Sequence, residues 1–357
     1  MAHLFEALRI RDVQFRNRIF VSPMCEYSSQ DGFANDWHFV HLGSRAVGGA
    51  ALVMTEASAV TPEGRISPAD LGIWKDAHVD FLARIFRFIA QQGAVPGMQL
   101  AHAGWKASTA EPWKGGGTVS PAEGGWRPIF SASAVPFTEG YQVPVALDES
   151  GIARIARAFG DAARRALAAG ARVLEIHSAH GYLLHSFLSP ISNRRNDGYG
   201  GSFENRIRFL LETVTCVREA WPEKYPLFVR ISASDWSERG WTIDESVALA
   251  RRLKGLAVDL IDCSSGGVLA KAAIPVGAGY QVPFAERIRR DAGIMTGAVG
   301  MITTAQQADA IVRGGQADAV FLARELLRDP YFPLRAAAEL HQDITWPNQY
   351  LRAKRTH

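Results

Sequence analysis

The chain has 357 residues, of which 47% are hydrophobic, and its net charge of +3 is spread without long basic runs, which argues against nucleic acid as the main partner. No apolar run reaches the ~18 residues of a membrane span, and the first ten residues, MAHLFEALRI, lack the apolar core of a signal peptide, so we expect a cytoplasmic protein without a membrane partner. The three cysteines form no CxxC pair, so zinc ribbons and iron–sulfur clusters are not expected.

Eight short apolar runs along the chain predict buried strands. They cover residues 19–23, 51–57, 95–102, 172–177, 227–232, 259–265, 293–298 and 318–324. Near-continuous apolar strands are typical of a parallel sheet that is covered on both faces. Amphipathic helical patterns lie between the runs, and the clearest of them, over 148–170, places Ile152, Ile155 and Phe159 on one face. Two more patterns predict helices over 202–221 and 303–316.

The alternation of strands and helices predicts the fold. Strand, helix, strand at this rhythm indicates βαβ units, and eight of them indicate a closed (β/α)8 TIM barrel. A doubly wound open sheet is the alternative, but no G-x-G-x-x-G follows the first strand. We therefore expect one barrel domain over 1–357. Its rhythm is broken after the third strand by residues 104–147, whose three tryptophans favour an ordered cap over the barrel mouth, with a structural surface excursion as the alternative.

Several strand ends carry polar residues, and in barrels of this kind the chemistry lies at the C-terminal ends of the strands. TGAVG (296–300) ends the seventh strand, and Arg324 follows the eighth where a helix begins. Backbone N–H groups and a guanidinium at these two ends favour a phosphate site over simple glycine turns and an Arg324–carboxylate pair. Arg230 needs an anion or an electron-rich ligand, and Gln99 offers a donor and an acceptor to a heterocycle. Taken singly, an ion pair and a satisfied core amide explain these two residues as well.

The stretch EIHSAHGYLLHSFLSP (175–190) leaves the fourth strand with three histidines and a tyrosine. His177 and His180 can donate two hydrogen bonds to one oxygen, and Tyr182 can supply a proton. A packed turn is the second interpretation. A metal site that adds His185 is the third, although no H-E-x-x-H pattern is present. We favour the donor pair and expect no metal.

Over essentially its whole length the chain resembles the Old Yellow Enzyme family of FMN-dependent ene-reductases, and within it the branch of thermophilic-like enzymes and xenobiotic reductases. The resemblance rests on a series of motifs in a fixed order. These are NRIFVSPMCEYSS (17–29), PEGRISPADLGIW (62–74), QLAHAGWKAS (99–108), EIHSAHGYLLHSFLSPISNRRNDGYGGSFENRIRF (175–209), VRISASDW (229–236), CSSGG (263–267), TGAVGMI (296–302) and ARELLRDPYF (323–332).

The resemblance implies roles for the residues at matching positions. It implies that NADPH or NADH reduces FMN, which then reduces the C=C bond of an α,β-unsaturated carbonyl compound. The positions matched to flavin contacts are Ser22, Pro23, Met24, Cys25, Ala57, Gln99, Arg230, Ser264, Gly300, Ala323 and Arg324. Cys25 stands beside the flavin ring and tunes its potential; nothing in the sequence makes it a nucleophile. His177 and His180 hold the substrate carbonyl, Tyr182 donates the proton, and Tyr27 lines the substrate site.

The C-terminal end and one motif position extend this resemblance. NQYLRAK (348–354) resembles a tail that reaches the neighbouring subunit's site, with Tyr350 and Arg352 contacting substrate there, so we expect a homodimer or homotetramer. The tail covers residues 344–357. Family members often carry arginine where this chain has Trp105, which bears on the substrate range. The alternative that the residues leave open is a phosphate-binding barrel lyase or isomerase without flavin.

Overall fold

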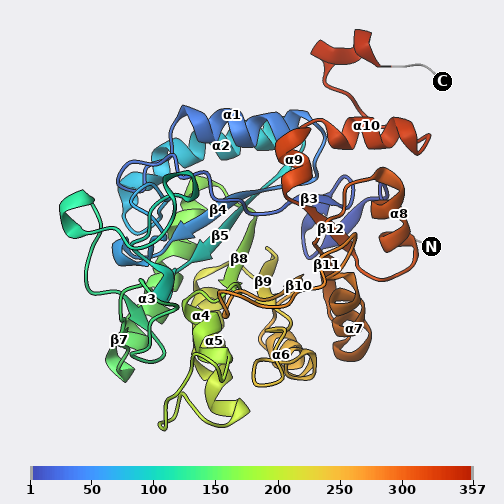
Figure 1. Cartoon of the computed structure of the whole chain (residues 1–357). Helices are drawn as coiled ribbons and strands as arrows, with labels where there is room; N and C mark the ends of the chain where they lie inside the picture. Colours follow the sequence, from blue (N-terminus) through green and yellow to red (C-terminus); the bar gives the residue numbers. More distant parts are fainter. Residues whose placement is uncertain (1–2, 355–357) are drawn as a thin grey trace.

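Eight parallel strands close into a barrel in the computed structural model, which describes residues 3–354 (Figure 1). They are β3 (Ile19–Val21), β4 (Leu52–Ala59), β5 (Val95–Ala101), β8 (Val173–Ser178), β9 (Leu227–Ser232), β10 (Leu260–Ser264), β11 (Met295–Ala298) and β12 (Ala319–Leu322). The barrel closes between the last and the first strand, where Val320 pairs with Ile19 and Leu322 with Val21. All eight predicted strands and the TIM-barrel fold are confirmed.

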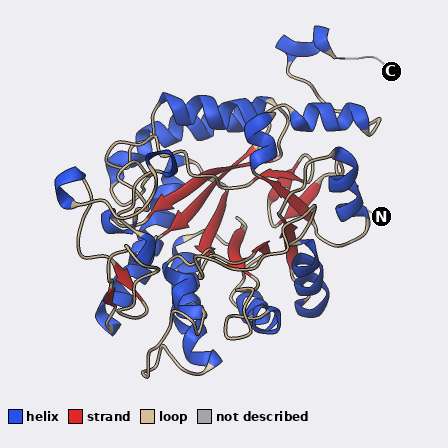
Figure 2. Cartoon of the chain, viewed as in Figure 1, coloured by secondary structure: helices blue, strands red, loops and turns tan. Residues whose placement is uncertain are grey.

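Helices surround the strands (Figure 2). They are α1 (Asp36–Val47), α2 (Val79–Gln91), α3 (Glu149–Ala169), α5 (Phe203–Ala220), α6 (Ile243–Gly255), α7 (Val282–Ala292), α8 (Ala305–Arg313) and α10 (Phe332–Glu339). The predicted helix over 148–170 is α3, which begins where the Asp148 side chain accepts the N–H of Gly151 and ends at Gly170 with φ +100°. Its Ile152, Ile155 and Phe159 are buried as the pattern indicates.

The N-terminal end of the barrel is filled by a hairpin that the apolar runs did not predict. Strands β1 (Leu8–Ile10) and β2 (Val13–Phe15) pair in antiparallel fashion. Phe15 packs on Phe20, with 4.9 Å between the ring centroids, and belongs to one buried cluster with Phe228 and Phe321. Phe20 and Phe228 are the second residues of β3 and β9, so the N-terminal end of the barrel is apolar and the polar residues lie further along the strands.

Two segments extend from the barrel. Residues 104–147 contain three short 3-10 helices, Gly104–Lys106, Pro112–Lys114 and Pro121–Glu123, and the strand pair β6 (Phe130–Ser131) and β7 (Val145–Ala146). After β12, α9 (Arg324–Arg328) and α10 lead into a tail with a 3-10 helix over Asn348–Ala353 that extends away from the barrel (Figure 1). Residues 1–2 of the predicted domain and 355–357 of the predicted tail lie outside the described residues.

The short helix α4 (Leu183–Leu188) follows β8 and carries the third histidine of the H-x-x-H-x-Y-x-x-H stretch. None of the helices within residues 3–354 has the length and apolar character that crossing a membrane requires.

Candidate active site

A polar layer lies inside the barrel, above the apolar end. Gln99, Glu175, Arg230 and Asp262 are buried on four successive strands, β5, β8, β9 and β10. Gln99 Nε2 donates to Glu175 Oε1 at 2.7 Å, and Arg230 Nε lies 3.1 Å from Asp262 Oδ2. The predicted core amide and ion pair are therefore both present. Each predicted flavin contact in this layer is held by a buried carboxylate.

Two buried carboxylates share one cation in this layer. Burial, and next the nearby Asp262, raise the pKa of Glu175 to about 8, although Arg230 opposes the rise. Burial raises the pKa of Asp262 to about 6. Glu175 is therefore the carboxyl that holds a proton near neutral pH, and Asp262 balances the guanidinium. The sequence prediction missed both acids, although an acidic residue inside an otherwise apolar strand is a signal that could have found them.

The loop after β8 brings together the three predicted catalytic side chains. The ring centroid of His177 lies 5.1 Å from that of His180 and 5.0 Å from that of Tyr182. His177 Nδ1 accepts the N–H of Ala179 at 3.3 Å, so its proton is on Nε2, which is left to donate. His180 Nε2 lies 2.6 Å from the Oγ of Ser264, a predicted flavin contact.

The electrostatic surroundings keep these three groups neutral. Burial lowers the pKa of both His177 and His180 well below the usual histidine value, and the positive charge of Arg230 lowers it further. Burial raises the pKa of Tyr182, so the phenol keeps its proton. The arrangement can therefore offer two uncharged imidazole donors and one phenolic proton to a substrate oxygen and carbon.

The segment after β3 carries the four residues of the SPMC motif, which are predicted to contact the flavin. The Ser22 hydroxyl is buried and has no hydrogen-bond partner in the described chain, which leaves it available to a ligand. Burial raises the pKa of Cys25, so the sulfur is a thiol, which agrees with a contact role. Pro23 and Met24 are half-buried between them. Tyr27 has φ +47° and meets the cap residue Trp113 edge-on, 5.6 Å between centroids.

The ends of β11 and β12 enclose a cavity of about 220 Å³. Its lining includes five of the predicted flavin contacts, Arg230, Ser264, Gly300, Ala323 and Arg324. Gly300 has φ +121°, which favours glycine, and a Cβ there would come within 2.9 Å of Gln281 Nε2. The Arg324 side chain forms no hydrogen bond or ion pair with another described residue, so the alternative carboxylate partner is not found. An unpaired guanidinium beside a glycine turn fits the phosphate of FMN.

Ala57 completes the predicted flavin set. It stands opposite Gln99 in the β4–β5 ladder, directly after a bulge that shifts the register from Met54. A small side chain at this position leaves room next to the amide.

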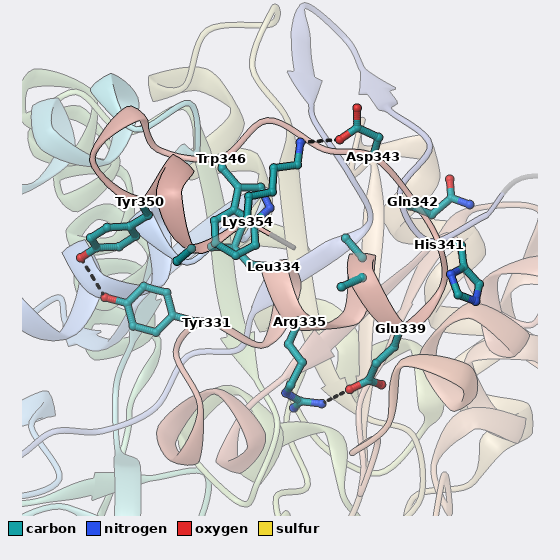
Figure 3. A pocket seen from close by; sticks show the side chains of 13 residues that line it. Tyr331, Leu334, Arg335, Glu339, His341, Gln342, Asp343, Trp346, Tyr350 and Lys354 are labelled. Atoms are coloured by element: carbon teal, nitrogen blue, oxygen red, sulfur yellow. Dashed lines mark hydrogen bonds and ion pairs between the residues drawn. The ribbon is translucent and has the colours of Figure 1, made fainter. Parts of the chain in front are cut away.

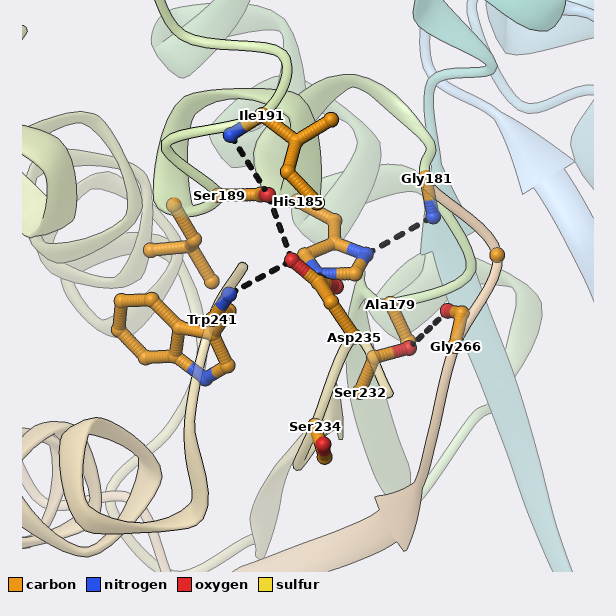
Figure 4. Close-up of polar contacts among 12 residues, drawn as sticks. Ala179, Gly181, His185, Ser189, Ile191, Ser232, Ser234, Asp235, Trp241 and Gly266 are labelled. Carbon is orange, nitrogen blue, oxygen red and sulfur yellow. Dashed lines mark hydrogen bonds and ion pairs between the residues drawn. The ribbon is translucent and has the colours of Figure 1, made fainter. Parts of the chain in front are cut away.

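The third histidine does not join the other two. His185 Nδ1 accepts the N–H of Gly181, and its Nε2 lies 3.1 Å from Asp235 Oδ1 (Figure 4). Nδ1 is thus hydrogen-bonded to the backbone, and Nε2 lies within ion-pair distance of Asp235. Within residues 3–354, no three His, Cys, Asp or Glu side chains are arranged to hold a metal ion.

The predicted tail residues lie elsewhere in a single chain. Tyr350 lines a cavity of about 980 Å³ between α10 and the tail, where its hydroxyl is 3.4 Å from that of Tyr331 (Figure 3). The cavity contains none of the predicted barrel-mouth residues. Arg352 is exposed on the same 3-10 helix. One chain alone therefore does not bring either residue to the histidine pair, and their role stays a prediction.

Trp105, in the predicted cap segment 104–147, contacts the loop that carries the histidines. Its side chain is only 3% exposed, and its Nε1 donates to the carbonyl of Gly181 at 2.5 Å. The neighbouring Lys106 donates to the carbonyls of His180 and Gly267, at 2.7 and 2.5 Å. The residue that departs from the family pattern thus contacts the backbone of the histidine loop.

Comparison with known proteins identifies the family to which the chain is similar. The profile of the NADH:flavin oxidoreductase / NADH oxidase family matches residues 3–343. An NADPH dehydrogenase of Geobacillus sp. (strain WCH70) is 50% identical over 354 residues, covering 99% of this chain and 98% of that protein. Morphinone reductase superposes with a TM-score of 0.81 at 24% identity, covering 97% of this chain and 91% of that one.

A second solved structure, a 2-naphthoyl-CoA reductase complex, superposes with a TM-score of 0.84 at 23% identity over 95% of this chain. This chain spans about half, 52%, of the length of that reductase. At these identities the two solved structures support the barrel fold alone. The family profile and the curated relative decide the assignment: the chain belongs to the NADH:flavin oxidoreductase / NADH oxidase family, the Old Yellow Enzyme family that its motifs predict, and is a flavin-dependent oxidoreductase.

Proposed function

We propose that the chain is an ene-reductase that uses FMN and NADPH to reduce the C=C bond of α,β-unsaturated carbonyl compounds. The observation that carries the proposal is the pair of neutral imidazoles, His177 and His180, whose ring centroids lie 5.1 Å apart at the end of β8. His180 also contacts Ser264, a predicted flavin residue. The preference for NADPH over NADH rests on the name of the Geobacillus relative. A barrel lyase or isomerase without flavin is disfavoured by the family membership.

The residues divide into a flavin set and a substrate set. Gly300, Ala323 and Arg324 would hold the phosphate of FMN, and Ser264 its ribityl chain. Arg230 and Gln99 would hold the polar edge of the ring, and the SPMC segment with Ala57 its faces. The chemistry that bound FMN supplies is the relay of a hydride from the nicotinamide to the substrate.

The substrate set acts on the two ends of the enone. His177 donates from Nε2 to the carbonyl oxygen, and His180 supplies the second donor. Because negative charge grows on this oxygen during hydride addition, each donor is worth about 2.7–4 kcal/mol in the transition state. Tyr182, whose pKa is raised by burial, holds a proton for Cα. Tyr27 and the cap border the substrate.

The tail and the assembly form the finer part of the proposal. We infer that Tyr350 and Arg352 contact substrate in the neighbouring subunit of a homodimer or homotetramer. The direction of the tail, away from its own barrel, supports this (Figure 1). A cytoplasmic location and one functional domain over 1–357 also stay predictions.

An anaerobic titration of the purified protein tests the function. Flavin absorption should bleach with NADPH and return on addition of 2-cyclohexenone. His177→Ala should keep FMN bound and still bleach, while reoxidation by the enone slows by roughly 10²–10³, the usual cost of losing one oxyanion donor. A colourless protein that takes up no added FMN, or a variant with unchanged enone reoxidation in stopped flow, would overturn the assignment.

A further inference from the structure

His185 is the member of the H-x-x-H-x-Y-x-x-H stretch for which the proposed function has no role. It lies on α4, and its side chain is wholly buried. Its ring bridges two partners: Nδ1 accepts the N–H of Gly181 at 2.9 Å, and Nε2 lies 3.1 Å from Asp235 Oδ1 (Figure 4). Because Nδ1 is an acceptor, the ring proton is on Nε2 and faces the carboxylate.

Asp235 is itself held in place. It is 1% exposed and lies after β9. The Ser189 hydroxyl donates to its Oδ2 at 2.6 Å, and the N–H of Trp241 donates to the same oxygen at 2.7 Å. Both donors use Oδ2, which leaves Oδ1 directed at His185 (Figure 4). The carboxylate therefore lies where it favours a proton on Nε2, and, against the effect of burial, the nearby His185 lowers the pKa of Asp235.

The turn that His185 holds is strained. His180 has φ +59°, a left-handed conformation that costs a non-glycine residue on the order of 1 kcal/mol. Gly181 follows with φ +77°. Such a turn persists only where its surroundings hold it. The backbone is held on each side, since Ser232 Oγ accepts the N–H of His180 at 2.9 Å and Lys106 donates to its carbonyl.

Gly181 lies between His180 and Tyr182 and is held at both ends. Trp105 donates to its carbonyl, and His185 accepts its N–H. Without His185, this buried N–H has no other partner in the described residues, and an unsatisfied buried donor is costly. The peptide would then rotate and carry the flanking side chains with it.

We propose that His185 and Asp235 are positioning residues, which fix the His180–Gly181 turn and thereby aim His180 and Tyr182 at the substrate. The proposal rests on the proposed role of the histidine pair. It assigns the third histidine to the backbone rather than to a metal or to the substrate. The tautomer is the essential element, because only a ring with its proton on Nε2 can accept from Gly181 and donate to Asp235.

Asp235→Asn is the sharpest variant, since it keeps the shape of the side chain. The asparagine oxygen can still accept from Ser189 and Trp241, so its NH2 group replaces Oδ1. His185 Nε2 must then accept, its proton moves to Nδ1, and two donors face each other at Gly181. The holoenzyme labelled with [15N]histidine should show by NMR a His185 signal that changes from the Nε2–H to the Nδ1–H tautomer.

Phenol binding and enone reoxidation should both weaken when the His185 tautomer changes. In Asp235→Asn, the Kd of 4-hydroxybenzaldehyde, a phenol whose oxygen should bind the histidine pair, should rise roughly tenfold, and enone reoxidation should slow up to roughly 10²-fold, as for a small misplacement of catalytic groups. His185→Leu should lose as much. His185→Gln should recover most of the loss, because its amide can accept from Gly181 and donate to Asp235. FMN absorption should be unchanged in all three.

Ser189→Ala is the matched control. It removes one hydrogen bond from Asp235 but leaves the tautomer, so it should lower the melting temperature while the phenol Kd stays near that of the wild type. Equal functional losses in Ser189→Ala and Asp235→Asn, or an Asp235→Asn variant with wild-type phenol binding, would overturn the proposal. A wild-type enzyme that neither binds phenols nor reduces enones would instead overturn the proposed function, and the NMR tautomer would still decide whether Asp235 controls the ring.

Discussion

Two sides of the barrel mouth differ in how their polar groups are satisfied. On the β8 side, the backbone of His180 and Gly181 is held by Ser232, Lys106, Trp105 and His185. On the β11–β12 side, the lining of the cavity of about 220 Å³ includes Arg324, whose side chain has no hydrogen bond or ion pair in the described chain.

The β8 side therefore has the features of a rigid catalytic site, and the β11–β12 side those of a site that a ligand fills. Donors that stabilise a developing charge work best when they are fixed before the reaction, since no reorganisation is then needed. An anion site can leave its donors without a protein partner until the ligand arrives, because Arg324 is exposed to solvent. A substitution on the β8 side should therefore change rates, and one on the β11–β12 side should change FMN affinity.

The largest effect is expected at Arg324. Replacing Arg324 by alanine removes a charged hydrogen bond of about 1.5–3 kcal/mol, so the Kd of FMN, measured from the fluorescence of released flavin, should rise roughly 10- to 150-fold. Arg328→Ala is the matched control, because Arg328 lines the same cavity but already pairs with Glu325 at 3.1 Å. Equal FMN affinity in the two variants would contradict the division between the two sides.

Much of the fold was predictable because it depends on local patterns. Eight apolar runs gave eight strands, and the Asp148 and Gly170 caps gave the bounds of α3. The hairpin at the lower end was not predictable in this way, since β1 and β2 are three residues each and owe their stability to burial against the barrel. Short strands carry too little periodicity to stand out.

The residues of the site were predictable from the sequence, but the partners that hold them in place were not. Strand-end position identified Arg230, Gln99 and the histidine pair, and the family motifs gave them roles. No spacing rule links His185 to Asp235, which are 50 residues apart and meet only because β8 and β9 are neighbours in the barrel. The same holds for Glu175, whose partner Gln99 lies on the adjacent β5.

A smaller effect is expected at the polar layer that joins the two sides. The folded-state pKa of Glu175 is about 8 against a usual 4.5. Between these values the folded protein binds a proton that the unfolded chain does not, so stability is present at low pH and is lost as the pH rises through about 8. The melting temperature of the wild type should fall between pH 6 and pH 9, and in Glu175→Gln that part of the fall should disappear, a difference of roughly 2–4 °C or more.

Asp262→Asn serves as the contrast, because Asp262 balances Arg230. Its removal should leave the guanidinium without its partner and lower stability at pH 6 as well as at pH 9. A Glu175→Gln variant whose melting temperature falls with pH as steeply as that of the wild type would mean that Glu175 is not the group that holds the proton.

The smallest effect is expected from the titration of Lys106 on the β8 side, whose hydrogen bonds should not depend on pH. Burial lowers the pKa of Lys106 from 10.5 to about 7. The neutral amine still has the two N–H groups that bind the carbonyls of His180 and Gly267, so the turn should survive deprotonation. What is lost as the pH rises through about 7 is a positive charge near the histidine pair, which favours negative charge on the substrate oxygen.

For a partly exposed charge this is worth up to about 1 kcal/mol, or roughly two- to fivefold in rate. Enone reoxidation followed by stopped flow should therefore fall by this factor between pH 6 and pH 8. In Lys106→Met the step should vanish, and the rate should be low throughout because the turn has also lost two hydrogen bonds. If the enone reoxidation rate of Lys106→Met still falls between pH 6 and pH 8, the titrating group is not Lys106. The charge on the β8 side of the barrel mouth would then not change near neutral pH.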